Sequence, residues 1–395
     1  MHESTAIAHL FEEPQEQHGA VNPPVYHASL FAFPDYETWK AHVAGQQSRP
    51  YVYHRGSNPT VRILEEKIAH LEHGADCVAT ASGMAAINLV LSALLQTGDH
   101  VLCVDTVYGP TRSALQSLYR RFGVETTFFP AEASQDLRPY LQDNTRLIFL
   151  ESPSSGLFQI QDLRAVAALA RERGIWTAID NTWATPLYQK PLDLGLDLSV
   201  HSGTKYIAGH SDLLLGLVVG TQEAMRPVRR VYTLLGASLA PDDAYLALRG
   251  LRSLPIRLRQ HETSALRIAR WLQEHPEVVE VLHPGLESHP HHALHRSQCM
   301  GDSGLFSFRL RPRGEAARAA FVNSLRLFHL GYSWGGFESL LSPLAFSYYG
   351  NHELRRQLGL TDDHYRVSIG LEDPEDLLQD LAQALEIYRR SGEAP

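Results

Sequence analysis

The chain contains little cysteine, and its few thiols are scattered. Only Cys77, Cys103 and Cys299 occur among 395 residues. Three thiols at these spacings are too few for a disulfide framework, and they do not match a zinc-binding pattern. We therefore expect three core or surface thiols in a protein of the reducing cytoplasm.

A long apolar run and a block of basic residues are also missing. The longest apolar run, residues 213–219, has the length of a buried strand and is far too short to span a membrane. The formal net charge is -9, and no basic block offers contacts to the phosphates of nucleic acid. The N-terminus is polar and acidic, unlike a secretory signal. These absences argue against a membrane span, a nucleic-acid partner and secretion.

The chain does have enough apolar material for a large core. A hydrophobic content of 44% in 395 residues predicts more than one domain. Residues 1–58 are rich in Pro, Tyr and His and show a helical period only over residues 37–44, which predicts an extended arm that contacts a neighbouring subunit. We predict a large domain over residues 59–250 and a smaller C-terminal domain over residues 251–395.

Strand-like and helix-like segments alternate through the middle of the chain. A helical pattern over residues 61–71 is followed by apolar strand candidates separated by helical stretches, which predicts a mostly parallel sheet with helices on both faces. A long amphipathic helix then runs from about residue 242 to about residue 274, and further strands typical of a smaller α+β domain follow it. The strand candidates are residues 76–81, 101–104, 147–150, 176–180 and 198–201, then 278–282 and 304–310.

Lysine is scarce as well, and one of the four lysines has an unusual setting. Lys205 follows an apolar strand candidate and lies among small and hydroxyl residues in the segment from His201 to Asp212. Such a crowded turn suits a lysine whose amine is held at a carbonyl carbon to form a Schiff base. A surface lysine in an ordinary loop is the alternative that this spacing alone leaves open.

Two other segments favour the chemical interpretation of Lys205. Asp180 ends an apolar strand candidate, and a buried carboxylate at that place would keep the ring nitrogen of pyridoxal phosphate protonated. Gly83 and Met84 open a helix after Ser82, where exposed amides and a glycine can accept a phosphate. Helix capping explains most Ser-Gly starts, so this third segment is evidence only in combination with the other two.

Short motifs that include these three segments occur over nearly the whole chain, from about Val21 to about Leu385. They resemble the motifs of the fold-type I pyridoxal-phosphate enzymes of cysteine and methionine metabolism. This family includes cystathionine β-lyase, cystathionine γ-synthase, cystathionine γ-lyase and methionine γ-lyase. The resemblance implies a homotetramer built from dimers, with active sites shared across the dimer, and a small amino-acid substrate. The motifs are Tyr53-His54-Arg55 with Asn58-Pro59-Thr60, Ser82-Gly83-Met84, Tyr108-Gly109, Glu151-Ser152-Pro153, Asp180-Asn181-Thr182, the Lys205 segment, the segment from Trp334 to Leu340 and the segment from Arg366 to Glu372.

The resemblance assigns a role to each group that would hold the cofactor. Lys205 would bind it as a Schiff base and later carry the proton removed from the substrate Cα, which needs a pKa lowered by burial and nearby positive charge. Tyr108 would stack on the pyridine ring, although an ordinary buried tyrosine is the alternative. Asp180 would pair with the ring nitrogen. The phosphate would be bound by the Gly83 and Met84 amides and by the Ser202 and Thr204 hydroxyls, with Tyr53 and Arg55 reaching it from the neighbouring subunit.

The resemblance also implies a substrate site. Arg366 would bind the substrate α-carboxylate as a bidentate fork, an arrangement that lysine cannot reproduce, with a structural ion pair as the alternative. Ser333 would add a backbone contact to the same carboxylate. Trp334 would press against the substrate.

Three departures from the γ-type members favour β-elimination. Ser154-Ser155-Gly156 follows Glu151-Ser152-Pro153 and lacks the asparagine that γ-enzymes usually have there. The segment before Gly335 generally carries leucine in γ-enzymes, whereas here it is Tyr332-Ser333-Trp334-Gly335-Gly336, which resembles bacterial cystathionine β-lyase. Pro110 stands where methionine γ-lyases typically have cysteine. We therefore expect elimination from L-cystathionine, or from a related cysteine S-conjugate, to a thiol such as homocysteine, pyruvate and ammonia, as in methionine biosynthesis.

Two alternatives to this activity stay open. A cystathionine γ-lyase or γ-synthase would share every cofactor residue and would release 2-oxobutyrate in place of pyruvate. A non-catalytic regulatory protein that only binds the cofactor would keep its biological activity without Lys205.

A histidine-rich stretch from His289 to His295 suggests a metal site only weakly. His291 and His295 have the spacing of helical metal ligands, but no neighbouring carboxylate or cysteine completes a set. We expect a solvated helix start there and no bound metal.

Overall fold

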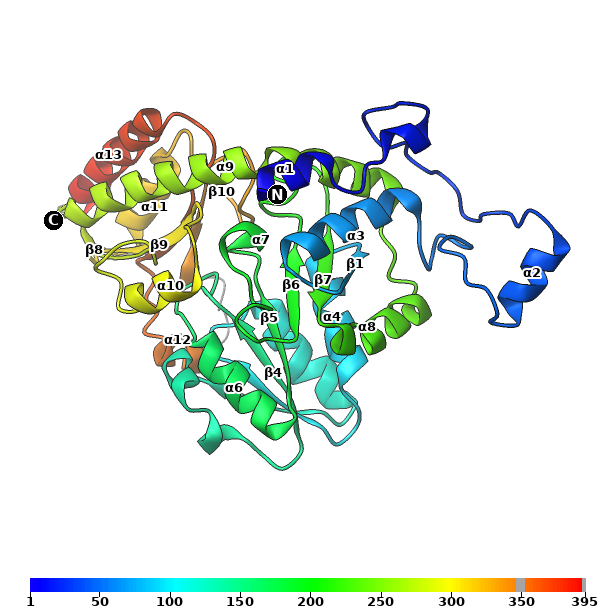
Figure 1. Cartoon of the computed structure of the whole chain (residues 1–395). Coiled ribbons are helices and arrows are strands. Elements are labelled where there is room, and N and C mark those ends of the chain that lie inside the picture. Colours follow the sequence, from blue (N-terminus) through cyan, green and yellow to red (C-terminus); the bar gives the residue numbers. More distant parts are fainter. Residues whose placement is uncertain (346–351, 393–395) are drawn as a thin grey trace.

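The computed structural model describes residues 1–345 and 352–392, and it contains two β-sheets (Figure 1). The larger sheet has seven strands in the order β1-β7-β6-β5-β4-β2-β3. Strands β3, β2, β4, β5 and β6 run parallel, and β7 runs antiparallel to both β6 and β1. The strands are β1 (Asp76–Thr80), β2 (His100–Val104), β3 (Glu125–Phe129), β4 (Thr145–Glu151), β5 (Trp176–Asp180), β6 (Leu198–Ser202) and β7 (Gly216–Gly220).

Apolar side chains on both faces explain why this sheet is covered on both sides. Side chains alternate between the faces of a strand. Val78 and Val218 accordingly belong to one core cluster, whereas Cys77, Ala79 and Leu217 belong to another. Helix α4 packs against β6 and β7, and α3 packs against β1 and the long helix α9 (Pro241–Glu274). The helices of this part are α3 (Pro59–Leu71), α4 (Gly83–Leu94), α5 (Gly109–Ser113), α6 (Leu163–Arg173), α7 (Thr185–Tyr188) and α8 (Gln222–Leu235), with a π-helix at Ala114–Tyr119 and short 3₁₀ turns at Ala131–Gln135 and Arg138–Tyr140.

A second sheet of five strands follows α9 (Pro241–Glu274) in the chain. Its order is β10-β11-β12-β9-β8, and every pair except β10 with β11 is antiparallel. Phe306, Phe308, Phe321 and Tyr365 form the aromatic centre of its core. The elements are β8 (Val278–Leu282), β9 (Leu305–Leu310), β10 (His329–Leu330), β11 (Leu340–Pro343), β12 (His364–Ser368), α10 (His292–Gln298), α11 (Glu315–Ser324), α12 (His352–Gln357) and α13 (Pro374–Ser391).

The first residues of the chain form an arm that leaves the body of the molecule. Helix α1 (Glu3–His9) lies against α9, and a 3₁₀ turn follows at Pro14–Gln17. Helix α2 (Tyr36–Val43) projects away from both sheets (Figure 1). On α2, Tyr36 is 67% exposed and Val43 is 65% exposed, although both are apolar. These exposed side chains are consistent with the expected contact to a neighbouring subunit, which stays a prediction.

The fold class expected from the sequence is confirmed, with differences in detail. Strand β3 was missed, because this edge strand is polar at its start and only Phe129 is fully buried. The domain boundary predicted at residue 250 falls inside α9, so the exact division of the chain stays a prediction. All three cysteines are buried and free. Across residues 1–345 and 352–392, no helix is long and apolar enough to cross a bilayer.

The expectation of a solvated helix start in the histidine-rich stretch is wrong for His295. This side chain is buried, and its Nε2 lies 2.7 Å from Asp302 Oδ1. The carboxylate partner comes from the residues just after α10, outside the histidine-rich stretch itself. Within the described residues no cluster of three His, Cys, Asp or Glu side chains has a metal-binding arrangement.

Gly216 sets how closely β7 can approach the start of α4. A Cβ atom at this position would lie 2.0 Å from the carbonyl oxygen of Ser82 and 2.5 Å from Thr80 Oγ1. We expect Gly216→Ala to lower the free energy of unfolding by about 1–3 kcal/mol in urea denaturation, because backbone must move to relieve the overlap.

Gly56→Ala is the matched control for this prediction. Its added methyl group would meet only the carbonyl oxygen of Tyr53, at 3.5 Å. We expect a change within about 0.5 kcal/mol for this variant, as for most surface substitutions. Equal unfolding free energies for the two variants would contradict the packing role of Gly216.

Candidate active site

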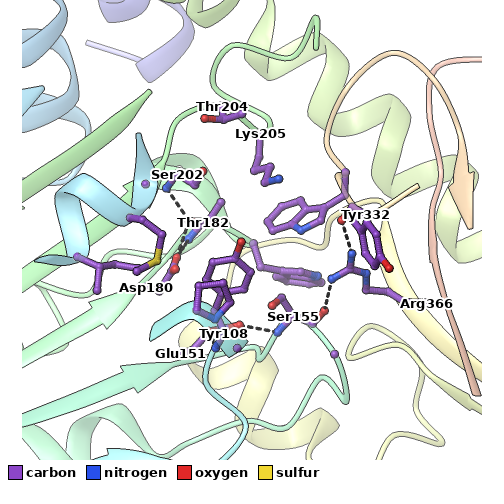
Figure 2. Close-up of a pocket in the computed structure, with 18 of the residues that line it drawn as sticks. Tyr108, Glu151, Ser155, Asp180, Thr182, Ser202, Thr204, Lys205, Tyr332 and Arg366 are labelled. Atoms are coloured by element: carbon purple, nitrogen blue, oxygen red, sulfur yellow. Dashed lines mark hydrogen bonds between the residues drawn. The ribbon is translucent and has the colours of Figure 1, made fainter. Parts of the chain in front are cut away.

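A cavity of about 680 Å³ opens at the carboxyl ends of the parallel strands (Figure 2). Strands β4, β5 and β6 end there at Glu151, Asp180 and Ser202. In open α/β sheets this edge is where ligands bind. Nine of the residues predicted from sequence line the cavity: Gly83, Met84, Tyr108, Asp180, Ser202, Thr204, Lys205, Trp334 and Arg366.

The start of α4 forms one wall of the cavity. Ser82 caps the helix, and its Oγ accepts a hydrogen bond of 3.1 Å from the amide of Ala85. A Cβ atom on Gly83 would lie 2.8 Å from both Cβ and Oγ of Ser202, so only glycine lets the helix start approach the end of β6 this closely. Unpaired amides at a helix start attract anions. This wall is therefore suited to a phosphate group.

Asp180 is a buried carboxylate at the end of β5. The amide of Thr182 donates a 3.0 Å hydrogen bond to Asp180 Oδ1, and the Thr182 hydroxyl donates to the same oxygen. Burial raises the pKa of Asp180, whereas the Thr182 hydrogen bonds and the charges of His201 and Lys205 lower it. A cationic group bound in the cavity would favour the ionised form.

Lys205 lies in the turn after β6, and its side chain points into the cavity (Figure 2). Its Nζ donates a 2.9 Å hydrogen bond to Ser333 Oγ and lies 5.4 Å from the centre of the Trp334 ring. Burial, together with the charge of Arg366, lowers the pKa of Lys205 to about 8, although Asp180 acts in the opposite direction. The amine is thereby brought close to the neutral form that a nucleophile or base requires.

Arg366 reaches the cavity from β12, in the second sheet. Its guanidinium donates to two backbone carbonyls, that of Ser155 at 3.2 Å and that of Tyr332 at 2.5 Å. These contacts hold the cation at the rim of the cavity, on the side away from Asp180 (Figure 2). The position suits recognition of a substrate carboxylate.

Three predicted site residues lie outside the cavity lining. Ser333 is adjacent to it and contacts Lys205 through its hydroxyl, whereas the sequence predicted a backbone contact to substrate. Tyr53 is 52% exposed, and Arg55 donates to the carbonyl of Thr233 at 2.7 Å. Neither Tyr53 nor Arg55 lines the cavity of its own chain, so their role stays a prediction about a neighbouring subunit.

Sequence reasoning did not include several residues that line the cavity. Glu151 and Thr182 are the most important, since both make hydrogen bonds that shape the site. Both belong to motifs that carried the family resemblance, Glu151-Ser152-Pro153 and Asp180-Asn181-Thr182. That membership was the available signal. Tyr332 also lines the cavity, and it belongs to the segment before Gly335 that favoured a β-lyase, although no role was assigned to it. No pattern in the sequence marked Leu344, which lines the cavity as well.

The residues of the cavity fit pyridoxal phosphate. The helix start of α4 suits its phosphate, the buried carboxylate of Asp180 suits its ring nitrogen, and the Lys205 amine, with its lowered pKa, suits its aldehyde carbon. When bound, this cofactor supplies an electron sink for electrons left behind at the substrate Cα. The fold and the site are those of a pyridoxal-phosphate-dependent enzyme.

Comparison with known proteins gives the family. The chain matches the family model described as Cys/Met metabolism PLP-dependent enzyme over residues 4–386. The cystathionine β-lyase of Bordetella avium is 40% identical over 393 residues, with 98% of each chain covered. The cystathionine γ-lyase of Bacillus subtilis is 38% identical over 390 residues, covering 98% of this chain and 100% of the relative.

A solved structure is similar over the same extent. The crystal structure of cystathionine γ-synthase from Xanthomonas oryzae pv. oryzae in complex with cystathionine matches with a TM-score of 0.93 and 39% identity, covering 99% of both chains. The chain therefore belongs to the Cys/Met metabolism PLP-dependent enzyme family, as its motifs predicted. It is a pyridoxal-phosphate-dependent enzyme of the lyase type, and the two relatives named above are cystathionine lyases.

We expect Lys205→Ala to remove covalent attachment of the cofactor, because this amine is the one that points into the cavity. Protein incubated with pyridoxal phosphate and reduced with borohydride would be analysed by peptide mass spectrometry. Wild type should be labelled at Lys205, and Lys40→Ala, which changes an exposed lysine on α2, should be labelled equally. A label on another lysine in the wild type would contradict the assignment.

Proposed function

We propose that the protein is a carbon–sulfur β-lyase. Its substrate is L-cystathionine or a related cysteine S-conjugate, and its products are a thiol such as homocysteine, pyruvate and ammonia. The observation that carries this proposal is the position of Trp334 beside Lys205. Trp334 lines the cavity, and the centre of its ring lies 5.5 Å from that of Tyr206 and 5.4 Å from Lys205 Nζ. The Lys205 amine donates a hydrogen bond to Ser333 Oγ.

The distinction from γ-elimination rests on the number of protons that the base must remove. β-Elimination needs one proton from Cα, whereas γ-elimination needs a second proton from Cβ and so requires a base that serves both carbons. Lys205 Nζ donates a hydrogen bond to Ser333 Oγ and lies 5.4 Å from the centre of the Trp334 ring. We infer that these two contacts keep the amine at Cα, as a reaction with a single proton removal requires.

Each residue has a defined part in the proposed reaction. Lys205 would hold the cofactor covalently, and its amine would take the proton from the substrate Cα. Arg366 would bind the α-carboxylate, and Asp180 would pair with the ring nitrogen. The Cβ–S bond breaks with its electron pair leaving on sulfur, and the 2-aminoacrylate that is released hydrolyses to pyruvate and ammonia. Tyr108 would stack on the ring, and the Gly83 and Met84 amides would bind the phosphate together with the Ser202 and Thr204 hydroxyls.

The test of the proposed function is the identity of the keto acid. We expect purified holoenzyme and L-cystathionine to yield pyruvate with homocysteine, because the thiolate leaves from Cβ. Keto acids would be separated as hydrazones and the thiols identified by mass spectrometry. Release of 2-oxobutyrate with cysteine would overturn the proposal in favour of a γ-lyase, which the Bacillus subtilis relative keeps as the second candidate. No keto acid from cystathionine or from other cysteine conjugates would overturn both.

The same proposal includes a homotetramer in which Tyr53 and Arg55 complete the site of a neighbouring subunit. Both residues lie outside their own cavity, and Tyr53 is half exposed. We expect Lys205→Ala and Arg55→Ala proteins each to lose most activity, and their co-expressed mixture to recover about a quarter of wild-type activity. Half of randomly formed dimers are mixed, and each mixed dimer has one intact site. A mixture no more active than its components would contradict sharing of the site.

A further inference from the structure

Glu151 lines the cavity and has no part in the reaction described so far. It ends β4, is 3% exposed, and stands opposite Asp180 in the register of β4 with β5. Its two carboxylate oxygens accept different backbone amides. Oε2 accepts the amide of Tyr108 at 2.6 Å, and Oε1 accepts the amide of Ser155 at 2.7 Å.

These two amides belong to the two halves of the site. Tyr108 precedes α5 and lines the cavity where the cofactor ring is proposed to lie. The carbonyl of Ser155 accepts a hydrogen bond from Arg366, the proposed carboxylate-binding residue. One carboxylate therefore connects the position of Tyr108 with the position of Arg366 (Figure 2).

Both hydrogen bonds favour the ionised form of Glu151. An ionised carboxylate accepts at both oxygens, whereas a protonated one carries a donor that would face an N–H group. Ionisation is opposed by burial and by the charge of Asp180, which together raise the pKa of Glu151 to about 7. The other charged side chains lining the same cavity are Lys205 after β6 and Arg366 on β12, and both are cationic.

We propose that Glu151 is a positioning residue whose ionised carboxylate holds Tyr108 and the Ser155–Arg366 contact in place together, so that the cofactor half and the substrate half of the site assemble as one unit. The second half of this inference rests on the proposed role of Arg366. Loss of the hydrogen bond to the Tyr108 amide would leave Tyr108 less firmly positioned. Loss of the hydrogen bond to the Ser155 amide would do the same for the Ser155–Arg366 contact. A cationic ring nitrogen bound at Asp180 would favour the ionised form of Glu151 and so strengthen both of its hydrogen bonds.

The test replaces Glu151 with glutamine, which retains one acceptor and places an amide donor against the second N–H group. Glu172→Gln is the control, since Glu172 is an exposed residue of α6 on the same part of the chain. In apoprotein at pH 8, we expect the Tyr108 or Ser155 amide to exchange with deuterium about tenfold faster in Glu151→Gln than in wild type, for one lost hydrogen bond to a charged acceptor. Glu172→Gln should match wild type.

A pH series in the wild type gives an independent readout that needs no variant to fold. Protection of the two amides, corrected for the intrinsic exchange rate, should fall as the pH is lowered through about 7, because protonation removes one acceptor. In Glu151→Gln the protection should be low and independent of pH. In holoenzyme, KM for the cysteine conjugate should rise about tenfold for the variant, with a smaller change in kcat, since carboxylate binding is weakened more than proton removal.

The outcomes separate this inference from the proposed function. Wild-type amide protection that does not change with pH, or a Glu151→Gln protein with unchanged exchange and unchanged KM, would overturn the role of Glu151. Absence of any keto acid from wild-type holoenzyme would overturn the proposed function, while the exchange measurements on apoprotein would still test Glu151.

Discussion

The common direction of β2, β4, β5 and β6 is the constraint on which the rest of the site depends. Parallel strands end at the same edge of their sheet, so residues far apart in sequence are delivered to one place. Glu151, Asp180 and Ser202 are the last residues of three neighbouring strands. Antiparallel β7 contributes differently. Its Gly216 lets the sheet approach the start of α4, which forms the wall suited to an anion.

The charged groups of the cavity lie close enough together that each one shifts the pKa of its neighbours. Asp180 and Glu151 are buried side by side, and burial makes the ionised form of each unfavourable. Backbone amides and Thr182 compensate by donating hydrogen bonds to these carboxylates. Lys205 experiences the opposite effect, since burial and Arg366 together favour its neutral amine. Burial in the same cavity therefore lowers the pKa of the proposed base, Lys205, and raises the pKa values of Asp180 and Glu151. A cationic ring bound there would favour the ionised form of both carboxylates.

The second sheet contributes the groups that face the substrate. Arg366 lies on β12, and Ser333 and Trp334 lie in the segment between β10 and β11. The guanidinium of Arg366 bridges the two parts of the molecule, because it bonds to Ser155 beyond β4 and to Tyr332 beyond β10. The family is defined by its dependence on the cofactor. The groups that we propose to face the substrate reach the cavity only because the two sheets meet there.

The sequence by itself determined the fold class, the family and the residue types of the cofactor site, because these are recorded in local patterns. The Lys205 segment, Asp180 after an apolar strand and the Ser82-Gly83 helix start are each readable within a few residues. The sequence did not predict the polar edge strand β3 or the pairing of His295 with Asp302, since neither follows from local periodicity. Only the tertiary structure decided that Glu151 binds the amides of both Tyr108 and Ser155, because these contacts depend on strand register and burial. The sequence predicted that the pKa of Lys205 must be lowered if this amine acts as a base. The tertiary structure supplies the cause, because it buries the amine and places Arg366 of the second sheet near it.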